Sequence, residues 1–333
     1  MFFDGKQVLI TGGTGSVGVV LLKRLLEGDH GVPERILVLS RDEAKQSAMK
    51  TAYAMNAKLG DRFARRVQFR VGDVRDYSSL VAALDGIQIV FNAAALKQVP
   101  SCEYFPYEAV RTNIEGPENI VRVIQQCKYP VEVVVGISTD KACKPVNVMG
   151  MTKAIQERLF LSAPQRCPNT RFVCVRYGNV LASTGSVVPL FKEQIKRGGP
   201  VTVTVPNMTR FLLSLDAAVD TVFAAAETGQ SGETYIPRIP SACITDVAKA
   251  MIGNREIDIK VSGIRPGEKV HEILVSEDEV YRTFERGNYF VIASVLSKFE
   301  GVTCLEKEFS SEHVVMSLSE LTTLLQENGL LDA

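Results

Sequence analysis

The sequence lacks a net charge and lacks long apolar runs. Lysine plus arginine and aspartate plus glutamate each total 38 among 333 residues, so the formal net charge is zero. No overall charge is available to attract nucleic acid or an anionic membrane, and an anionic ligand must be held by local basic side chains. No run of 18 apolar residues is present, which argues against a transmembrane helix. We therefore expect neither a nucleic acid nor a membrane as partner.

Paired cysteines are also absent. The seven cysteines are scattered, none forms a CxxC pair, and only three histidines exist. This usage predicts reduced thiols and no metal site. The N-terminal residues MFFDGKQVLITGG enter a strand at once, without the basic and apolar segments of a signal peptide. Together these features predict a cytoplasmic protein.

Strand-like and helix-like segments alternate between residues 6 and 177. This alternation is typical of an α/β fold with a Rossmann-like, doubly wound parallel sheet. The alternation breaks down after residue 179, which predicts a smaller C-terminal α/β region for the substrate. We assign residues 1–178, with about 211–243 returning to the sheet, to the dinucleotide-binding domain. The substrate-binding region then comprises about 179–210 and 244–333.

A glycine-rich turn, TGGTGSVG, follows the apolar strand at residues 6–10 and precedes an apolar helix. Glycines in this context let the backbone approach a pyrophosphate, which the free N–H groups of the helix N-terminus stabilise. A tight turn without a ligand is the alternative. The residues predicted to bind the dinucleotide here are Gly12, Thr14, Gly15, Ser16, Val17 and Gly18.

The end of the second strand, residues 35–43, indicates which dinucleotide is bound. An NAD site usually has an acidic residue at this point, whereas this chain has Ser40 followed by Arg41, with Lys45 further on. A hydroxyl and a guanidinium suit a 2′-phosphate, which favours NADP. Asp42 keeps NAD open as an alternative. Arg41 can also be read as a solvated loop charge.

The third and fourth strands end in further candidate cofactor residues. Asp73 and Val74 stand where a carboxylate and an amide would meet an adenine edge, while Asp76 reads equally well as a helix cap. After the fourth strand, the small residues Ala93, Ala94 and Ala95 let a cofactor lie against the backbone.

Lys97 and Asn113 each carry two readings. Lys97 points either into the cleft or into solvent. Asn113 lies in a long amphipathic helix predicted over residues 107–128. Its amide either orients backbone or water near the cofactor or is a satisfied interior polar group.

Residues 131–153 read as a buried strand, a polar loop and the start of a helix. The loop places the hydroxyl of Thr139, the carboxyl of Asp140 and the amine of Lys141 side by side, a set suited to proton transfer. Met149 and Lys153 are four residues apart and share one face of the helix. The alternative for Asp140 and Lys141 is an ion pair or a loop cap.

Two later segments carry further candidates. The strand at residues 171–180 ends in Tyr177 and Asn179, and the turn GIRPGEK carries Arg265 and Glu268. A guanidinium with backbone amides at a Pro-Gly turn suits a substrate phosphate, and Glu268 is able to accept hydrogen bonds from a sugar hydroxyl. A solvated basic turn is the alternative.

The segments TGGTGSVG, SRDE, AAALKQVP, STDKA, RYGNV, MTRF and RPGEK occur in this order. In combination they resemble the extended short-chain dehydrogenase/reductase superfamily, and within it the UDP-N-acetylglucosamine 4,6-dehydratases. The resemblance covers residues 6 to about 275. It implies a tightly held NADP or NAD that is regenerated in each cycle, and UDP-N-acetylglucosamine as substrate. It also implies a homo-oligomer of at least two subunits.

The resemblance implies oxidation at sugar C4, elimination of water across C5 and C6, and return of hydride to C6. The product is then a UDP-4-keto-6-deoxy-N-acetylhexosamine. Lys141 is expected to act as the C5 base, with a depressed pKa, and Asp140 as the acid at C6. Thr139 is expected to bind the C4 oxygen and Lys153 the nicotinamide ribose. The expected substrate-binding residues are Lys97, Thr139, Asn179, Val187, Thr209, Arg210, Arg265 and Glu268; Tyr177, Asn179, Lys97 and Asn113 are also expected to contact the cofactor.

One position departs from the superfamily pattern. The helix motif YxxxK has Met149 in place of its tyrosine, while Lys153 is kept. A thioether has no exchangeable proton, so Met149 cannot remove the proton of the C4 hydroxyl. Some members of the resembled subgroup also carry methionine here. Two other functions stay open: a UDP-sugar C4-epimerase, and a cofactor-binding protein without catalysis.

Overall fold

The computed structural model describes residues 1–181 and 186–331. A nine-stranded sheet runs in the order β14-β15-β10-β6-β5-β4-β1-β2-β3. Seven of these strands are parallel, and they comprise β1 (Gln7–Thr11), β2 (Arg35–Ser40), β3 (Val67–Val71), β4 (Ile89–Asn92), β5 (Val133–Ile137), β6 (Arg171–Val175) and β10 (Thr234–Pro237). The predicted Rossmann-like α/β fold is thereby confirmed.

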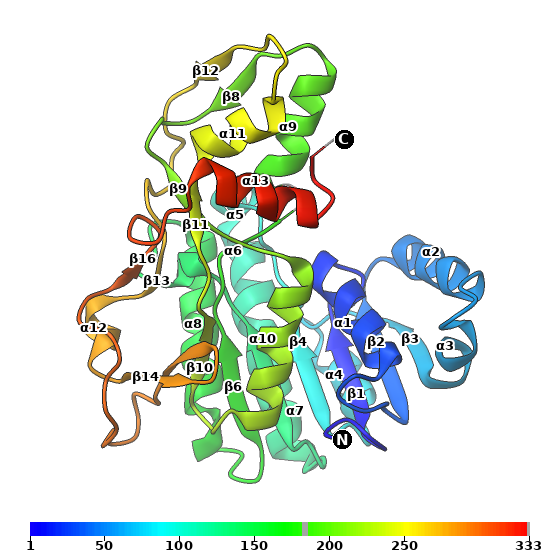
Figure 1. Ribbon diagram of the computed structural model, residues 1–333. Coiled ribbons are helices and arrows are strands. Elements are labelled where there is room, and N and C mark those ends of the chain that lie inside the picture. The colour runs from blue at the N-terminus through cyan, green and yellow to red at the C-terminus, as the bar shows by residue number, and fades with distance from the viewer. Residues whose placement is uncertain (182–185, 332–333) are drawn as a thin grey trace.

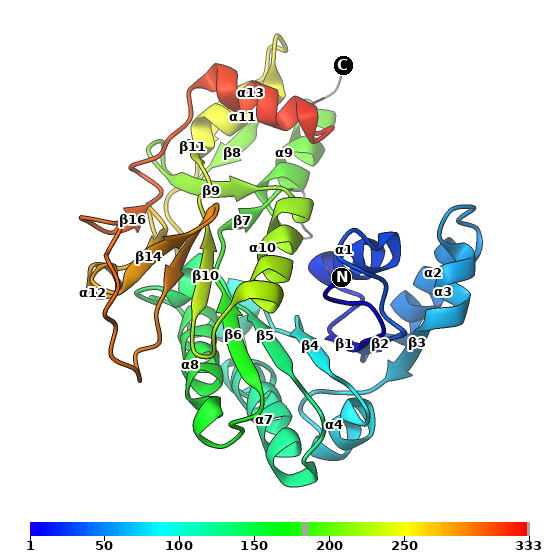
Figure 2. The same ribbon diagram turned by 60° about the horizontal axis from the view of Figure 1, so that its bottom comes forward.

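Helices cover both faces of the sheet (Figures 1 and 2). On one face, α1 (Ser16–Glu27) packs against α10 (Leu215–Thr228), and on the other lie α4 (Tyr77–Leu84), α7 (Gly116–Cys127) and α8 (Val148–Ser162). The central strands β1, β4 and β5 are therefore apolar over almost their whole length, as parallel strands buried on both faces must be. The helices α2 (Glu43–Ala54) and α3 (Gly60–Arg66) lie beside the β3 edge.

The helix predicted over residues 107–128 is interrupted. It comprises α6 (Pro106–Val110), a π-helical turn η1 (Arg111–Glu115) and α7, and the short helix α5 (Val99–Tyr104) precedes it. The turn contains Asn113, which is fully buried. A π-turn inserts extra backbone into a helix and changes the direction in which its side chains point. Here it occurs at a residue whose side chain is needed for a specific contact.

The last two strands of the sheet differ from the sequence-based division. β14 (Thr283–Arg286) and β15 (Tyr289–Ile292) form an antiparallel hairpin that pairs with β10, although residues 244–333 were assigned to the substrate-binding region. The hairpin signal is short, because only Gly287 and Asn288 separate the two strands, with Gly287 at φ +59°. These four-residue strands are too short to be predicted from a sequence pattern, and they are identified only from their pairing with the sheet.

A smaller lobe lies above the carboxyl ends of the parallel strands (Figure 1). It has its own apolar core, built from α9 (Val187–Lys196), α11 (Ile244–Ile252), α13 (Leu318–Glu327), β8 (Val201–Val203) and β12 (Ile259–Val261). A three-stranded sheet of β7 (Asn179–Val180), β9 (Thr209–Leu213) and β11 (Ser241–Cys243) connects the lobe to the main sheet.

A further arm runs beside the sheet and includes β13 (Ile273–Val275), α12 (Glu277–Val280) and β16 (Phe309–Ser310). Two short 3₁₀ helices, η2 (Asp140–Ala142) and η3 (Ala163–Gln165), flank α8. Within the described residues, no helix combines the length and apolar character needed to cross a bilayer.

Candidate active site

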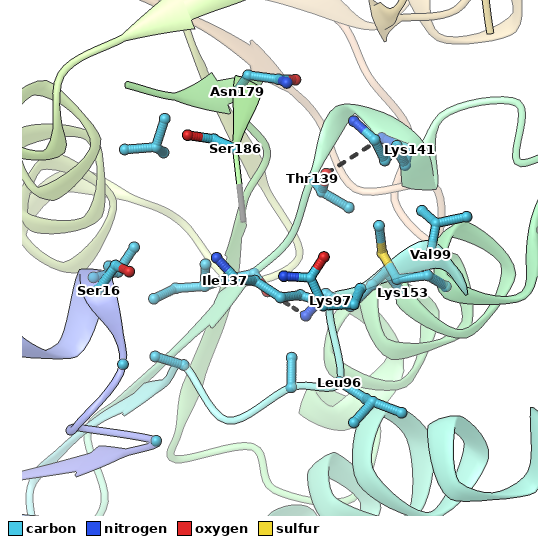
Figure 3. A pocket seen from close by; sticks show the side chains of 18 of the residues that line it. Ser16, Leu96, Lys97, Val99, Ile137, Thr139, Lys141, Lys153, Asn179 and Ser186 are labelled. Atoms are coloured by element: carbon cyan, nitrogen blue, oxygen red, sulfur yellow. Dashed lines mark hydrogen bonds between the residues drawn. The ribbon is translucent and has the colours of Figure 1, made fainter. Parts of the chain in front are cut away.

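A cavity of about 1180 Å³ lies between the carboxyl ends of the parallel strands and the smaller lobe. Loops that follow β1 to β6 form one wall, and α9, β9 and the turn at residues 265–268 form the other. Doubly wound folds bind their ligands at this edge of the sheet. Figure 3 shows that Lys97, Thr139, Lys141, Lys153 and Asn179 reach it from different segments.

The glycine-rich turn is shaped by close backbone contacts. Gly12 adopts φ +62°, and a Cβ there would lie 2.7 Å from the Cα of Ala94, so a side chain is sterically excluded. A Cβ on Gly18 would lie 2.5 Å from the Cα of Gly13, which keeps α1 close to the turn. The N-cap residue of α1, Gly15, has no side chain, and this helix terminus lines the cavity. The geometry therefore fits the pyrophosphate of a dinucleotide.

At the end of β2, two of the predicted residues are already engaged with neighbours. The Ser40 hydroxyl is buried and accepts a hydrogen bond from Thr14 Oγ1 at 3.1 Å. The carboxylate of Asp42 caps α2 by accepting from the backbone of Lys45. Arg41 is 54% exposed, with its guanidinium 3.7 Å from Asp73 Oδ2. Lys45, 67% exposed with its Nζ 3.1 Å from Asp42 Oδ2, lines the same part of the cavity, so Arg41 and Lys45 are both available cations at this edge.

Asp73 lines the cavity, but its carboxylate is occupied. Arg75 donates to it from both its backbone and its guanidinium. Burial raises the pKa of Asp73, yet the hydrogen bonds from Arg75 outweigh burial and hold the pKa below its usual value. The alternative reading of Asp76 is confirmed, because its carboxylate caps the N-terminus of α4.

The segment after β5 forms an ion-paired cluster with a residue from the arm. Lys141 Nζ lies 2.9 Å from Asp140 Oδ1 and 3.2 Å from Glu272 Oε1. Thr139 Oγ1 donates to the same Asp140 oxygen at 2.9 Å. Burial lowers the pKa of Lys141, but the charges of Asp140 and Glu272 raise it, and the net result is above the ordinary value.

Two expectations for this cluster are corrected. The depressed pKa expected for Lys141 is wrong in direction, because two carboxylates surround the ammonium. Asp140, expected to act directly at C6, is fully buried and does not line the cavity. Its carboxylate points into the protein, where it holds Lys141 and Thr139. Asp140 thus reaches the cavity through Thr139 and Lys141, which both line it.

Lys153, and not Lys141, is the buried lysine with a depressed pKa. Its ammonium is buried and donates to the carbonyl of Ile137 at 2.5 Å and to Gln156 Oε1 at 2.6 Å. Burial lowers the pKa of Lys153 to about 8. One turn away, Met149 packs against Cys102 and Ala109, and its side chain also lines the cavity. The two residues therefore share one helix face, as predicted.

Asn113 and Thr209 do not line the cavity, and the predicted direct contacts are corrected. The amide of Asn113 is used by the backbone of Leu96 and by Thr152 Oγ1, which supports the reading as a satisfied interior polar group. Thr209 faces the opposite side of β9, where its hydroxyl contacts His271 and Ser311. Strand alternation explains this orientation, because the neighbouring Arg210 does line the cavity.

The remaining predicted residues all line the cavity, including Lys97, Val187 and Arg265. Burial lowers the pKa of Lys97, in keeping with the reading that it points into the cleft. Tyr177 Oη, Asn179 Oδ1 and Glu268 Oε2 are buried and have no hydrogen-bond partner among the described residues. Unsatisfied buried polar atoms in a cavity wall are suited to meet polar ligand groups.

Arg210 is committed to the protein, because its guanidinium donates to the carbonyls of Thr209, Lys269 and Val270. It therefore shapes the turn that carries Glu268. Glu272, by contrast, was not singled out from the sequence. It lies four residues beyond Glu268, in the segment GEKVHEIL, and lines the cavity. The only sequence signal was a carboxylate four residues beyond the turn that was predicted to bind a ligand.

Comparisons with known proteins agree with this architecture. Residues 8–294 match the family described as "Polysaccharide biosynthesis protein". A protein of Rickettsia canadensis named UDP-glucose 4-epimerase is 45% identical over 298 residues, which cover 88% of this chain and 84% of that protein. The X-ray structure of Pen from Bacillus thuringiensis has a TM-score of 0.88 and 35% identity, and the match covers 98% of this chain and 99% of that one.

A more distant structure shares the fold alone. DesIV from Streptomyces venezuelae, a dTDP-glucose 4,6-dehydratase solved with NAD and TYD bound, has a TM-score of 0.68 and 21% identity. The match covers 79% of this chain and 86% of DesIV. The chain thus has the fold of nucleotide-sugar dehydratases and epimerases. It belongs to the polysaccharide biosynthesis protein family, within the extended short-chain dehydrogenase/reductase superfamily.

Proposed function

We propose that this protein is a UDP-N-acetylglucosamine 4,6-dehydratase. The observation that carries the proposal is the Lys141 ammonium, held by two buried carboxylates at the cavity wall. Inversion of the configuration at C4, the reaction of an epimerase, needs acid–base chemistry only around C4. Elimination across C5 and C6 also needs a group that moves protons at those carbons, and Lys141 is positioned to be that group.

The cofactor in this proposal is NADP, with NAD as the alternative. The N-terminus of α1 and the turn at Gly12 suit its pyrophosphate, and Arg41 suits a 2′-phosphate. When bound, the nicotinamide supplies hydride acceptance from C4 and hydride return to C6. Lys153 uses two of its three N–H groups within the protein, which leaves one for the nicotinamide ribose.

On the substrate side, unpartnered or exposed polar groups line the wall of the smaller lobe. Arg265, whose side chain is 60% exposed, suits the diphosphate, and the unpartnered oxygens of Asn179 and Glu268 suit sugar or ribose hydroxyls. Val187 and Lys97 complete the expected contacts. The UDP moiety rests on the family resemblance and on the name of the Rickettsia canadensis relative, UDP-glucose 4-epimerase, whereas the N-acetylhexosamine rests on the family resemblance alone.

In this mechanism the protein residues bind and move protons. Thr139 presents its hydroxyl to the C4 oxygen, and Asp140 orients both Thr139 and Lys141. Lys141 is protonated at rest, because its pKa lies above the ordinary value. It therefore suits protonation of the departing C6 hydroxyl, and it must first lose a proton before it can act as the C5 base.

The test uses purified protein with UDP-N-acetylglucosamine in deuterated water. Product NMR and mass are expected to show the loss of one water, a 4-keto group and deuterium at C5. Lys141→Ala and Asp140→Asn variants are expected to bind the UDP-sugar but to release no water. Normal turnover by either variant would contradict the assigned roles, and the same spectra report retention or inversion at C5.

UDP-sugar C4-epimerase is the second candidate, because the Rickettsia canadensis relative carries that name. An epimerase would return a product with the mass of its substrate, whereas a dehydratase product is lighter by one water. Met149 does not separate the two candidates, because both reactions begin with oxidation at C4, the step for which this site lacks the usual tyrosine.

A homodimer is also proposed. Large apolar side chains are exposed on α5, α6 and α8, which contact one another, and on the residue that joins α5 to α6; they comprise Tyr104, Phe105, Tyr107, Met151 and Ile155. Clustered exposed apolar residues on packed helices are typical of an interface between subunits. A second copy of this chain is the occupant that we propose for this surface.

A further inference from the structure

Lys141 lies between two carboxylates that come from different parts of the chain. Asp140 is its immediate neighbour in the sequence, whereas Glu272 directly precedes β13 in the arm. The Glu272 side chain is only 2% exposed, yet it lines the cavity, and Asp140 does not. The arm packs against η2, and this packing places a second carboxylate at the cavity side of Lys141.

The two carboxylates are held differently. Asp140 Oδ1 accepts hydrogen bonds from both Thr139 and Lys141, which stabilise its charged form. Glu272 Oε2 is buried without a hydrogen-bond partner among the described residues, as is Asp140 Oδ2, so the two carboxylates differ in the hydrogen bonds to Asp140 Oδ1 and not in their second oxygens. The other cations facing Glu272 are more distant, with Arg210 Nε at 3.8 Å and Lys269 Nζ at 4.0 Å. Lys269 is in addition engaged with the carbonyl of Cys143.

We propose that Glu272 is the proton store of Lys141, a positioning residue that acts on the substrate through the lysine. The inference deepens the proposed dehydratase function and rests on it. Glu272 accepts a proton from the Lys141 ammonium across their 3.2 Å contact, which leaves a neutral amine and a neutral carboxyl. Asp140 remains the fixed anion that orients the amine.

The proton balance closes over one elimination. The Lys141 amine takes the C5 proton as the C5–H bond breaks, and it becomes an ammonium again. The C6–O bond then breaks, and the ammonium protonates the departing oxygen, so that water is released. Glu272 returns its stored proton to the amine, which restores the resting ammonium and carboxylate. No oxidant, reductant or additional reactant is needed for this part of the reaction.

The test compares Glu272→Gln with Glu272→Asp. Glutamine keeps an oxygen that can accept a hydrogen bond from Lys141, but its amide cannot store a proton, whereas aspartate can. Three signals are followed with UDP-N-acetylglucosamine: absorbance of the reduced nicotinamide, deuterium uptake at C5 and release of water. We expect Glu272→Gln to reduce its cofactor normally and to lose at least about 100-fold in deuterium uptake and water release.

The aspartate variant is expected to recover part of the lost rate and to keep a pH profile of water release like that of the wild type. Glu277→Gln is the matched control, because Glu277 lies on the same arm, is 63% exposed and pairs with Lys144 outside the cavity. It is expected to leave all three signals unchanged. Thermal unfolding and UDP affinity, measured on every variant, report whether the fold and the nucleotide site are intact.

Near-normal water release by Glu272→Gln, in an enzyme whose wild type eliminates water, would overturn this inference alone. An equal loss of all three signals in both variants would also overturn it, since that pattern indicates a purely structural role. If the wild type itself releases no water and forms an epimer, the dehydratase function fails, and the proton-store role fails with it.

Discussion

Asn113 and Leu96 are joined by two hydrogen bonds. The Leu96 N–H donates to Asn113 Oδ1 at 2.8 Å, and Asn113 Nδ2 donates to the Leu96 carbonyl at 2.9 Å. The same Nδ2 lies 3.0 Å from Thr152 Oγ1 on α8. One side chain therefore links the loop that lines the cavity after β4 to the helix that carries Lys153. The π-turn η1 is what brings Asn113 to this position.

Replacement of Asn113 is expected to be costly. Asn113→Ala removes the side-chain partner of the partly buried Leu96 N–H and leaves the Leu96 carbonyl with the weak Cys102 thiol donor at 3.6 Å, a loss of about 1–3 kcal/mol for each bond. We expect the free energy of unfolding, measured in urea, to fall by roughly 3 kcal/mol. Asn288→Ala, at an exposed position in the β14–β15 turn, is the control and should change it by less than about 0.5 kcal/mol. A loss below about 1 kcal/mol for Asn113→Ala would contradict the bridging role.

The thioether of Met149 is expected to be chemically dispensable. Met149→Leu conserves volume within the small cluster with Cys102 and Ala109, so the cost in stability should stay below about 1.5 kcal/mol. Steady-state turnover of this variant is expected to remain within a few-fold of the wild type. Met149→Tyr then asks whether a phenol near Lys153 speeds the C4 step; an unchanged rate would show that the C4 base lies elsewhere. Loss of turnover in Met149→Leu would show that the sulfur itself is required.

Lys153 is expected to make stability depend on pH. Its folded-state pKa of about 8 is depressed from 10.5, so the unfolded chain binds more protons between these two values. The contribution of Lys153 is therefore complete above about pH 10.5 and is lost as the pH falls through 8. Its magnitude is on the order of 3 kcal/mol.

Lys153→Met removes this group while keeping an unbranched side chain. The difference in unfolding free energy between wild type and variant is expected to shift in favour of the wild type by that amount between pH 7 and 10.5. Urea titrations at several pH values measure the difference, in which other titrating groups cancel. A difference that does not vary with pH would show that burial of Lys153 does not depress its pKa.

Arg41 is expected to determine the preference for NADP. Removal of a charge-assisted contact costs about 1.5–3 kcal/mol, which corresponds to roughly a 10–100-fold weaker affinity. Arg41→Ala should therefore raise the Kd for NADP by this factor and leave that for NAD nearly unchanged, as measured by calorimetry. Arg65→Ala, on the exposed face of α3, is the control. Equal losses of affinity for NADP and NAD would show that Arg41 contacts a part of the dinucleotide that both cofactors share.

The apolar surface of α5, α6 and α8 is expected to mediate dimerisation. A double substitution, Phe105→Glu with Tyr107→Glu, places two charges where exposed aromatic side chains now lie, and should yield a monomer in analytical ultracentrifugation. Met55→Glu serves as the control, since Met55 is an exposed apolar residue on a different part of the surface. A wild type that is monomeric at all concentrations would refute the interface.

Signals confined to one stretch of sequence predicted the fold well. The buried parallel strands and the glycine-rich turn are encoded by consecutive residues, and the steric need for Gly12 is visible in its spacing before it is visible in space. The β14–β15 hairpin escaped prediction because its four-residue strands have no strong pattern of their own. Likewise, the reading of Asn113 stayed undecided because its partner Leu96 is 17 residues away.

By itself, then, the sequence determined the α/β class, the glycine-rich turn that is expected to bind a dinucleotide, and the placement of Lys141 at a strand end. It also showed that Met149 stands where the YxxxK motif has its tyrosine. Only the tertiary structure decided that the pKa of Lys153 is depressed and that of Lys141 is not, and which carboxylate lies at the cavity. The Lys153 ammonium donates to two neutral acceptors, whereas Lys141 is paired with Asp140 and Glu272, and that difference depends on an arm that returns more than 100 residues later. The electrostatic environment of a side chain depends on residues that are distant in the sequence, so it follows from the folded structure and not from the order of residues along the chain.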